Sequence, residues 1–383
     1  MLLTVSRLST TFDSAAGRVR AVDDVSFTVG AGRAVGVVGE SGSGKTVLSR
    51  SIMNLLPRRG VERSGEVRFD GRDLTTLSTK EMTSVWGRRM SMVFQDPMTS
   101  LNPVVRVGRQ ITESLVHHLG MSKTDARDEA IRLLEAVRIP EPERRFREYP
   151  HQLSGGMRQR VTIAIAIACS PDLLFADEPT TALDVTVQAQ ILDVLSDLRT
   201  DREMALVLVT HDLGVVAGRT DEIAVMYAGE IVEMAPTAVL FAEMRMPYSE
   251  ALLRSVPRLD DQPHRRRATI PGRPPNLAAP TPGCRFAPRC AYVAERCLSE
   301  RPRLEESGIP GHRFACFFPV GSTDGQSNLA RNVKAEWAPA LEIITHRRET
   351  RRSEPAGTPV QVSAAHDRDP VASPSTDSRK ASA

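Results

Sequence analysis

The chain has few aromatic residues, little net charge and no long apolar run, and each shortage excludes a class of function. Only 4% of its 383 residues are aromatic, so the stacking surfaces of single-stranded nucleic acid binders are not expected. A net charge of +3 gives little attraction for a polyanion, which argues against nucleic acid as a partner. The longest near-continuous apolar stretch, residues 161–169, is too short to cross a bilayer.

The N-terminus shows no targeting pattern. Residues 1–7 contain no charged segment followed by an apolar core, so no export signal is expected. The length allows two or three domains, and no internal repeat is visible. These observations predict a cytoplasmic protein that contacts a membrane only through partner proteins.

A glycine-rich loop is the clearest positive feature. It follows an apolar run at 34–38, typical of a buried parallel strand, and opens a helical pattern at 45–56. In such a loop, backbone N–H groups and the helix N-terminus face phosphate oxygens, the lysine reaches the β- and γ-phosphates, and the threonine hydroxyl ligates Mg²⁺. The eight residues of this phosphate loop are Gly39, Glu40, Ser41, Gly42, Ser43, Gly44, Lys45 and Thr46.

Two adjacent carboxylates follow a second apolar run. Residues 173–176 lead directly into Asp177 and Glu178, and side-chain alternation along a strand directs the two carboxylates differently. Asp177 suits a Mg²⁺ contact, and Glu178 suits the general base that polarises the attacking water. An acidic pair before Pro179 could instead start a helix, but the upstream phosphate loop favours the catalytic interpretation.

A second glycine motif precedes another helix. Ser154, Gly155 and Gly156 stand before a helical pattern at 157–169, so a free helix N-terminus is predicted to face an anion. The chain's own nucleotide is already served by the phosphate loop. We therefore interpret the motif as reaching the nucleotide of a neighbouring subunit, which makes this chain one half of an ATP-driven clamp.

In this order the motifs resemble those of the nucleotide-binding subunit of an ABC transporter, over roughly residues 1–320. The further matches are Gln95 in the glutamine loop, Asp184 at the end of the loop 182–184 that crosses the dimer interface, His211 as the switch histidine, and Phe12 near an adenine-stacking position.

The resemblance implies a role for each residue. Gln95 would sense Mg²⁺ and the attacking water, His211 would contact the γ-phosphate, and with Glu178 they form the expected catalytic set. The second glycine motif would bind the γ-phosphate held by the opposing subunit. Phe12 would lie under adenine, with an ordinary core position as the alternative. The expected Mg²⁺ contacts are Thr46, Gln95 and Asp177.

For the fold, the resemblance implies an α/β P-loop ABC ATPase cassette at 1–255. It would have a parallel-sheet core, an antiparallel β subdomain and an inserted helical subdomain at about 97–155, whose groove receives a coupling helix of the permease. Apolar spacing at 110–118 and 122–137 independently predicts helices there. Alternating helix and strand patterns at 156–235 predict a parallel sheet covered by helices.

The region after residue 235 resembles the C-terminal extension of dipeptide, oligopeptide and nickel importer ATPases. The matching residues are 247–248, 272–275, 283–286, 289–290 and 297. Short helices are expected near 238–241 and 247–253, with the extension proper at 256–320. The resemblance implies an ATPase that powers import of di- or oligopeptides, with nickel or another small solute as the alternative cargo.

The same resemblance implies partners. They are a second, related ATPase that forms a heterodimer, two integral-membrane permease subunits and an extracytoplasmic substrate-binding protein. The chain would lie peripherally on the cytoplasmic face of the inner or plasma membrane. ABC ATPases that act on DNA or ribosomes carry paired cassettes, long coiled-coil insertions or zinc modules, and none is visible here. The extension argues against an exporter.

Four of the five cysteines cluster in the extension, namely Cys284, Cys290, Cys297 and Cys316. A disulfide framework is disfavoured in a reducing compartment. The irregular spacing is compatible with a 4Fe–4S cluster, which some members of the resembled family carry, with zinc, or with unliganded thiols. A bound group would be structural, and Arg285 and Arg289 are expected to offset thiolate charge. Cys169 is expected to be a small buried residue.

The tail at 321–383 is dominated by polar residues and proline, which predicts disorder. Its apolar segment at 337–344 is either a docking element or an incidental patch.

Overall fold

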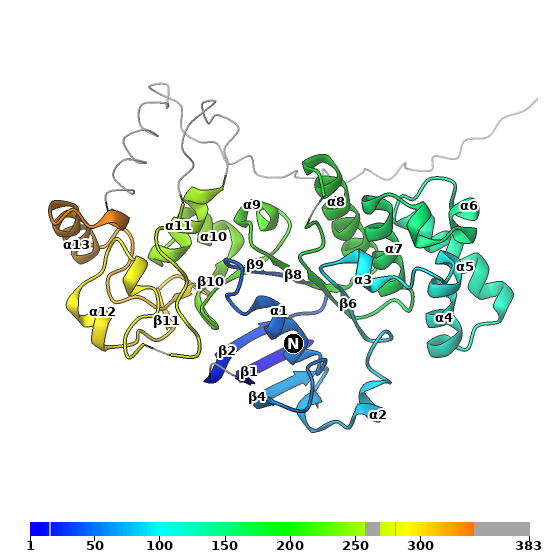
Figure 1. Ribbon diagram of the computed structural model, residues 1–383, viewed down its shortest axis with the longest axis horizontal. Coiled ribbons are helices and arrows are strands. Elements are labelled where there is room, and N and C mark those ends of the chain that lie inside the picture. Colours follow the sequence, from blue (N-terminus) through cyan, green and yellow to red (C-terminus); the bar gives the residue numbers. More distant parts are fainter. Residues whose placement is uncertain (15–16, 182, 257–268, 280, 341–383) are drawn as a thin grey trace, which may run out of the picture.

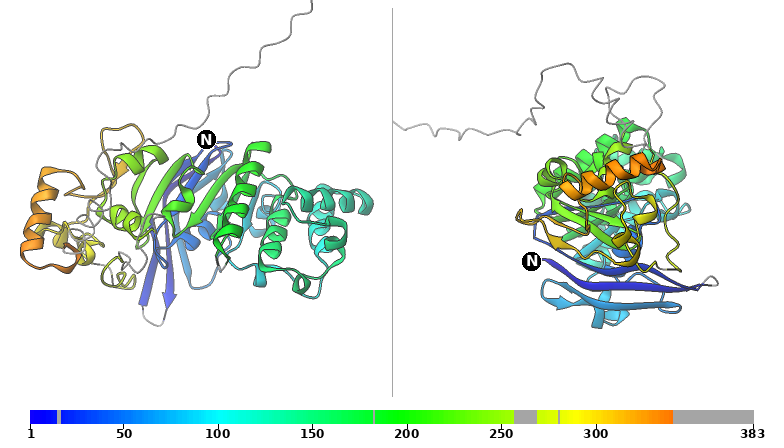
Figure 2. Two further views of the ribbon diagram at one scale, coloured as in Figure 1. Left: turned by 90° about the horizontal axis from the view of Figure 1, so that it is seen from above. Right: turned by 90° about the vertical axis from the view of Figure 1, so that its left-hand side faces the viewer.

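The computed structural model describes residues 1–14, 17–181, 183–256, 269–279 and 281–340. The described strands form two sheets, one of four and one of eight strands. Figure 1 shows the larger sheet in the middle, the antiparallel sheet below it, a helical part at one end and the C-terminal extension at the other. Figure 2, in its view from above, separates these two ends clearly.

The antiparallel sheet has the order β2-β1-β4-β5. Its strands are β1 (Leu3–Ser14), β2 (Gly17–Val29), β4 (Val61–Phe69) and β5 (Arg72–Asp73). Buried and less buried residues alternate along much of β1 and β2, as expected for a sheet with one covered face. The covered face packs on the larger sheet through an apolar cluster that also includes residues of α1 (Lys45–Ile52).

The larger sheet has the order β11-β12-β10-β9-β3-β8-β7-β6. Its strands are β3 (Ala34–Val38), β6 (Met90–Val93), β7 (Leu173–Asp177), β8 (Ala205–Thr210), β9 (Glu222–Tyr227), β10 (Glu230–Pro236), β11 (Glu305–Glu306) and β12 (Arg313–Phe314). The five strands from β9 to β6 run parallel, and almost every residue in them is buried. The predicted parallel core is therefore confirmed.

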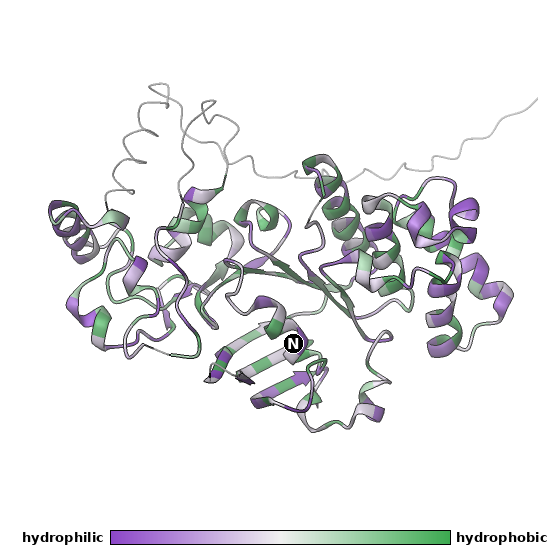
Figure 3. Ribbon diagram, in the orientation of Figure 1, coloured by the Kyte–Doolittle hydropathy of each residue, from purple (hydrophilic) through white to green (hydrophobic). Residues whose placement is uncertain are grey.

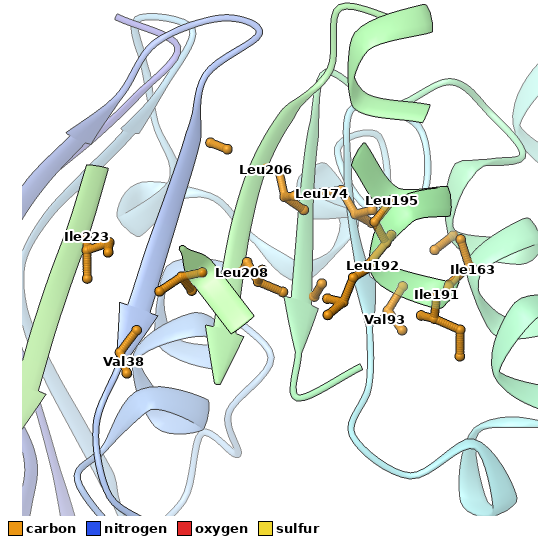
Figure 4. Close-up of a cluster of buried hydrophobic side chains, with 14 of the residues drawn as sticks. Val38, Val93, Ile163, Leu174, Ile191, Leu192, Leu195, Leu206, Leu208 and Ile223 are labelled. Atoms are coloured by element: carbon orange, nitrogen blue, oxygen red, sulfur yellow. The ribbon is translucent and has the colours of Figure 1, made fainter. Parts of the chain in front are cut away.

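Helices cover the other face of the parallel strands. They include α7 (Gly155–Ile167), α8 (Val185–Asp201) and α9 (Leu213–Val216), and a short α2 (Thr79–Met82) precedes β6. Figure 4 shows how Leu192 and Leu195 of α8 approach Leu174, Leu206 and Leu208 of the sheet. This continuous apolar layer fixes the carboxyl ends of the strands, where the candidate site lies.

The inserted segment is helical, as expected. It contains α3 (Pro97–Ser100), α4 (Val107–Leu119), α5 (Lys123–Ala136) and α6 (Pro142–Arg147). Ser122 caps α5 through its side chain, and Gly120 ends α4 with φ 65°, so local sequence sets both boundaries. Figure 3 shows hydrophilic residues over much of these outer helices and hydrophobic ones along the central strands.

The extension is joined to the larger sheet. After α10 (Thr237–Ala242) and α11 (Pro247–Ser255), the chain passes through a 3₁₀ turn (Ala287–Arg289) and α12 (Glu295–Ser299) to β11 and β12. Strand β12 pairs with β10, and the fully buried His312 Nε2 lies 3.0 Å from Glu233 Oε1 of β10. Cassette and extension thus share one sheet, a continuity that the sequence did not predict.

The tail does not begin as expected. Residues 323–334 form helix α13 instead of a disordered segment. Asn332 Nδ2 donates to the carbonyl oxygens of Ala291 and Val293, and Trp337 Nε1 donates to that of Cys290. These contacts hold α13 on the outer side of the extension (Figure 2). The rest of the apolar patch, from residue 341, lies outside the described residues.

Within the part of the chain that the structure describes, no helix is both long and apolar enough to traverse a membrane.

Candidate functional site

The phosphate loop connects β3 to α1 and is closely surrounded by backbone. A Cβ at Gly39 would lie 2.1 Å from the carbonyl oxygen of Met226, and one at Gly44 would lie 2.2 Å from that of Ala21. Gly44 also has φ 104°, a conformation that side-chain-bearing residues rarely adopt. Glycine at these two positions therefore lets the loop curl tightly above β3.

Lys45 holds the loop closed from within. Its ammonium donates to the carbonyl oxygens of Gly39 at 2.7 Å and Glu40 at 2.9 Å, and it lies 3.9 Å from Glu178 Oε1. The side chain is buried, and this desolvation lowers the pKa of Lys45. A buried ammonium beside a curled backbone is a strong partner for phosphate oxygens.

Thr46 and Asp177 provide an oxygen-rich corner beside the loop. Thr46 Oγ1 donates to Asp177 Oδ1 at 3.1 Å, although the two residues are far apart in sequence. Asp177 is fully buried, which raises its pKa, and its Oδ2 has no hydrogen-bond partner among the described residues. A hydroxyl with an orphaned carboxylate oxygen fits Mg²⁺, a cation that prefers oxygen ligands.

Three polar side chains from different segments contact the Glu178 carboxylate. Gln95 Nε2 donates to Glu178 Oε2 at 3.0 Å, Thr181 Oγ1 donates to the same oxygen at 2.9 Å, and His211 Nδ1 lies 3.5 Å from it. Glu178 has φ 45°, and its backbone N–H donates to the carbonyl oxygen of Val209. This left-handed turn at the end of β7 separates the Glu178 side chain from that of Asp177.

These contacts set the charges at the site. The contact with His211 lowers the pKa of Glu178, and the same contact raises the pKa of His211. Glu178 is therefore an ionised carboxylate at neutral pH, able to accept a hydrogen bond or a proton from water. The structure thus brings together Gln95, Glu178 and His211, the three residues that the sequence proposed as a catalytic set.

The second glycine motif lies apart from this cluster. Ser154 caps the 13-residue helix α7 by accepting a hydrogen bond from Met157 N at 3.3 Å, and Gly155 is exposed. A Cβ at Gly156 would lie 2.8 Å from Val187 Cγ1, so this glycine permits close packing on α8. Among the described residues, no hydrogen bond or ion pair joins the motif to the phosphate loop.

Asp184 lies at the start of α8, and Phe12 lies in β1. Asp184 is exposed and caps α8, with its Oδ1 accepting from Val187 N at 2.9 Å, and Ala182 before it lies outside the described residues. Phe12 lies half-buried in β1, opposite Val19 of β2 and Val61 of β4. Phe12 is thus part of the antiparallel sheet.

The four cysteines of the extension line one small cavity, and the other described residues that line it are apolar or aromatic. Burial raises the pKa of Cys284 to about 11 and that of Cys316 to about 12. Within the described ranges, no group of three or more His, Cys, Asp or Glu side chains is arranged to hold a metal ion. The four cysteines thus lie together, as their clustering in sequence predicted, but the described residues do not show the metal site that the expected 4Fe–4S cluster would require.

Three site residues were missed or misread from sequence. Thr181 was not singled out, although a hydroxyl three residues after Glu178 is placed for a turn contact. The expectation that Arg285 and Arg289 offset thiolate charge is wrong, because both guanidinium groups contact carboxylates of the cassette. The arginine contacts are revealed only by the fold, since Arg285 and Asp23 are 262 residues apart and Arg289 and Glu40 are 249 residues apart.

Comparisons with known proteins agree with this geometry. Residues 22–181 match the family described as ABC transporter, and residues 232–297 match the family described as oligopeptide/dipeptide transporter, C-terminal region. A dimeric ATP-binding cassette solved in a post-hydrolysis state with ADP and Pi is similar in fold, with a TM-score of 0.56 and 28% identity. That similarity covers 61% of this chain and 98% of the cassette.

Two curated relatives cover most of the chain. The oligopeptide transport ATP-binding protein OppD of Salmonella typhimurium is 48% identical, covering 84% of this chain and 94% of the relative. OppD of Bacillus subtilis is also 48% identical, covering 79% of this chain and 85% of the relative. With the phosphate loop, the buried acid pair and a C-terminal region of the matching type, the chain belongs to the ABC transporter family as an ATPase subunit of the oligopeptide/dipeptide type.

Proposed function

We propose that this chain hydrolyses ATP to power the import of di- and oligopeptides through a membrane permease pair. The observation that carries the proposal is the combination of a complete ATPase cassette with the oligopeptide-type C-terminal region, joined in one sheet by β10 and β12. The curated relatives are named for oligopeptide transport, which favours peptide over nickel or another small solute as cargo.

In this proposal the phosphate loop holds the nucleotide and Glu178 acts as general base. Its carboxylate, ionised and fixed by Thr181, would take the proton of the attacking water, while Gln95 orients that water and His211 donates to the γ-phosphate. Mg²⁺ held by Thr46, Gln95 and Asp177 would neutralise charge that develops on the phosphates. Phe12 is proposed to lie under the adenine ring.

The exposed motif at the start of α7 is proposed to serve the neighbouring subunit's nucleotide. The free N-terminus of a 13-residue helix favours an anion. The nucleotide on this chain's own phosphate loop would be bound by other groups. Asp184 would lie at the same interface. We propose a related but distinct ATPase as the neighbour, with the permease pair and an extracytoplasmic substrate-binding protein completing a transporter on whose cytoplasmic side this chain is bound.

Uptake by cells that lack this gene tests the cargo. Labelled di- and oligopeptides, and Ni²⁺ in parallel, are supplied to cells complemented with the wild-type chain or with Glu178→Gln. We expect only the wild type to restore peptide uptake, because transport needs completed hydrolysis. Restoration of Ni²⁺ uptake alone, or of neither, would reject peptides as cargo and leave the ATPase assignment in place.

We further propose that Cys284, Cys290, Cys297 and Cys316 hold a structural 4Fe–4S cluster. Support comes from the convergence of four thiols on one cavity whose other described lining residues are apolar or aromatic. Zinc and free thiols are the alternatives, and binding of either metal group requires the buried thiols to lose their protons.

Metal and sulfide analysis of protein purified without oxygen distinguishes these alternatives. We expect about four iron and four sulfide per chain, a ratio set by the cluster type, and loss of both when all four cysteines are replaced by serine. Cys169→Ser is the matched control and should keep both, because Cys169 lies in the core of the cassette. Stoichiometric zinc, or protein without metal, would contradict the cluster.

A further inference from the structure

Arg289 of the extension and Tyr248 of α11 both contact the phosphate loop. The Arg289 guanidinium makes a two-pronged ion pair with Glu40, with Nη1 donating to Oε2 at 2.6 Å and Nη2 donating to Oε1 at 2.9 Å. The Arg289 side chain is only 3% exposed and that of Glu40 is 25% exposed. A buried pair with two parallel hydrogen bonds fixes orientation as well as distance.

Tyr248 provides the second contact. The backbone N–H of Glu40 donates to Tyr248 Oη at 2.8 Å. Tyr248 is fully buried against Tyr227 and Phe286, with ring centroids 4.5 and 5.3 Å away, and burial raises the pKa of its hydroxyl. Its position is therefore set by the packing between α11 and the extension.

Glu40 is consequently held at every polar group. Its carboxylate is bound by Arg289, its N–H by Tyr248, and its carbonyl oxygen by Lys45 Nζ at 2.9 Å and by Ser43 N at 3.1 Å. Lys45 and Ser43 belong to the phosphate loop itself. Fixing Glu40 therefore fixes the first half of the loop before any phosphate arrives, which lowers the entropy lost on binding.

Arg289 is in turn positioned by the extension. Its Nε donates to the carbonyl oxygen of Pro271 at 2.8 Å, and Nη2 donates to that of Ile270 at 3.2 Å. The next residue, Cys290, lines the cysteine cavity. A change in the fold of the extension would thus move the group that holds Glu40.

We infer that Arg289 is a positioning residue for ATP. By holding Glu40 it presets the phosphate loop, so the C-terminal extension contributes to the ATP affinity of the cassette. The inference rests on the family's ATP site and is independent of the peptide cargo. A simpler role is that the pair only fastens the extension to the cassette.

Arg285 offers a matched control for that simpler role. It is also a buried arginine of the extension, and it pairs with Asp23 and, at 2.8 Å, with Glu230, which lie outside the phosphate loop. Arg285→Gln should therefore weaken the docking of the extension without releasing Glu40. Unfolding temperatures of both variants report how far each one loosens the structure.

The test measures ATP dissociation constants of the full-length chain and KM and kcat of the assembled transporter. For Arg289→Gln we expect about a tenfold weaker ATP affinity and a higher KM, because the variant loses the charge-assisted ion pair with Glu40 that positions the phosphate loop. The value of kcat at saturating ATP should be nearly unchanged, because the pair affects only the position of the loop. Arg289→Lys should recover part of the affinity. Glu40→Gln combined with Arg289→Gln should be no worse than Arg289→Gln, since the two residues act as a unit.

Two results would overturn the inference. One is an unchanged ATP affinity in a folded Arg289→Gln variant. The other is an equal loss of affinity in Arg285→Gln, which would assign the effect to docking of the extension as a whole. Neither result depends on which solute is imported, so a failed peptide assignment would remain a separate finding.

Discussion

Replacing Glu178 by glutamine is expected to leave ATP binding intact and to slow hydrolysis by about 10²–10⁴-fold, the usual contribution of a positioned general base. The amide keeps the size of the side chain, but it cannot accept a proton from water. Lys45 and Thr46, which would bind the nucleotide, keep their principal contacts with loop carbonyls and Asp177. Binding of labelled ATP and phosphate release in the assembled transporter measure the two effects separately.

Thr181→Val is the matched control for that variant. It removes one hydrogen-bond donor from Glu178 Oε2 but preserves the carboxylate, so turnover should fall far less. A second readout is the NMR titration of His211 in the nucleotide-free chain. The pKa of His211, raised by Glu178, should drop in Glu178→Gln, so the imidazole loses its proton at lower pH. Wild-type turnover in Glu178→Gln would refute the assignment of the base.

Replacing Gly155 by aspartate is expected to slow hydrolysis strongly without affecting ATP binding by the isolated chain. Among the described residues, a Cβ at Gly155 would meet only Leu183 Cδ2, at 3.5 Å, so the described part of the fold accepts a side chain there. In a closed pair of subunits, the new carboxylate would face the γ-phosphate of the neighbour's nucleotide. Repulsion at that site, together with loss of the helix N-terminus as an anion partner, should lower turnover by about 10²–10³-fold.

The variant Gly155→Asn is the control that distinguishes the effect of the added charge from the effect of the added side-chain volume. Asparagine has nearly the same shape as aspartate but no charge, so its turnover should lie well above that of Gly155→Asp. ATP binding by the isolated chain, turnover of the assembled transporter and nucleotide-dependent dimerisation are the three measurements. If Gly155→Asp weakened ATP binding by the isolated chain, the motif would serve its own subunit's nucleotide and the two-subunit site would be wrong.

The sequence by itself determined the local elements of the site. Gly39 and Gly44 stand where backbone atoms leave no room for a Cβ, and the apolar run at 34–38 forms a buried strand with the predicted bounds. Helices at 107–119 and 123–136 follow from apolar spacing and caps. These features depend on residues within a few positions of one another, so local conformational preference and burial suffice to predict them.

Only the tertiary structure decided which distant groups meet. Gln95 and His211 come from separate strand ends, and they reach Glu178 because β6, β7 and β8 lie side by side in the sheet. Arg289 of the extension meets Glu40 of the phosphate loop across 249 residues of sequence, a contact that only the folded chain shows.

The polar tail illustrates the same limit. Its composition predicts disorder, yet α13 is held by hydrogen bonds from Asn332 and Trp337 to carbonyl groups of the extension. Composition measures how much apolar surface a segment can bury on its own. Composition says nothing about the hydrogen-bond acceptors that a folded neighbouring segment presents. The structure of this helix was therefore determined only by the assembled fold.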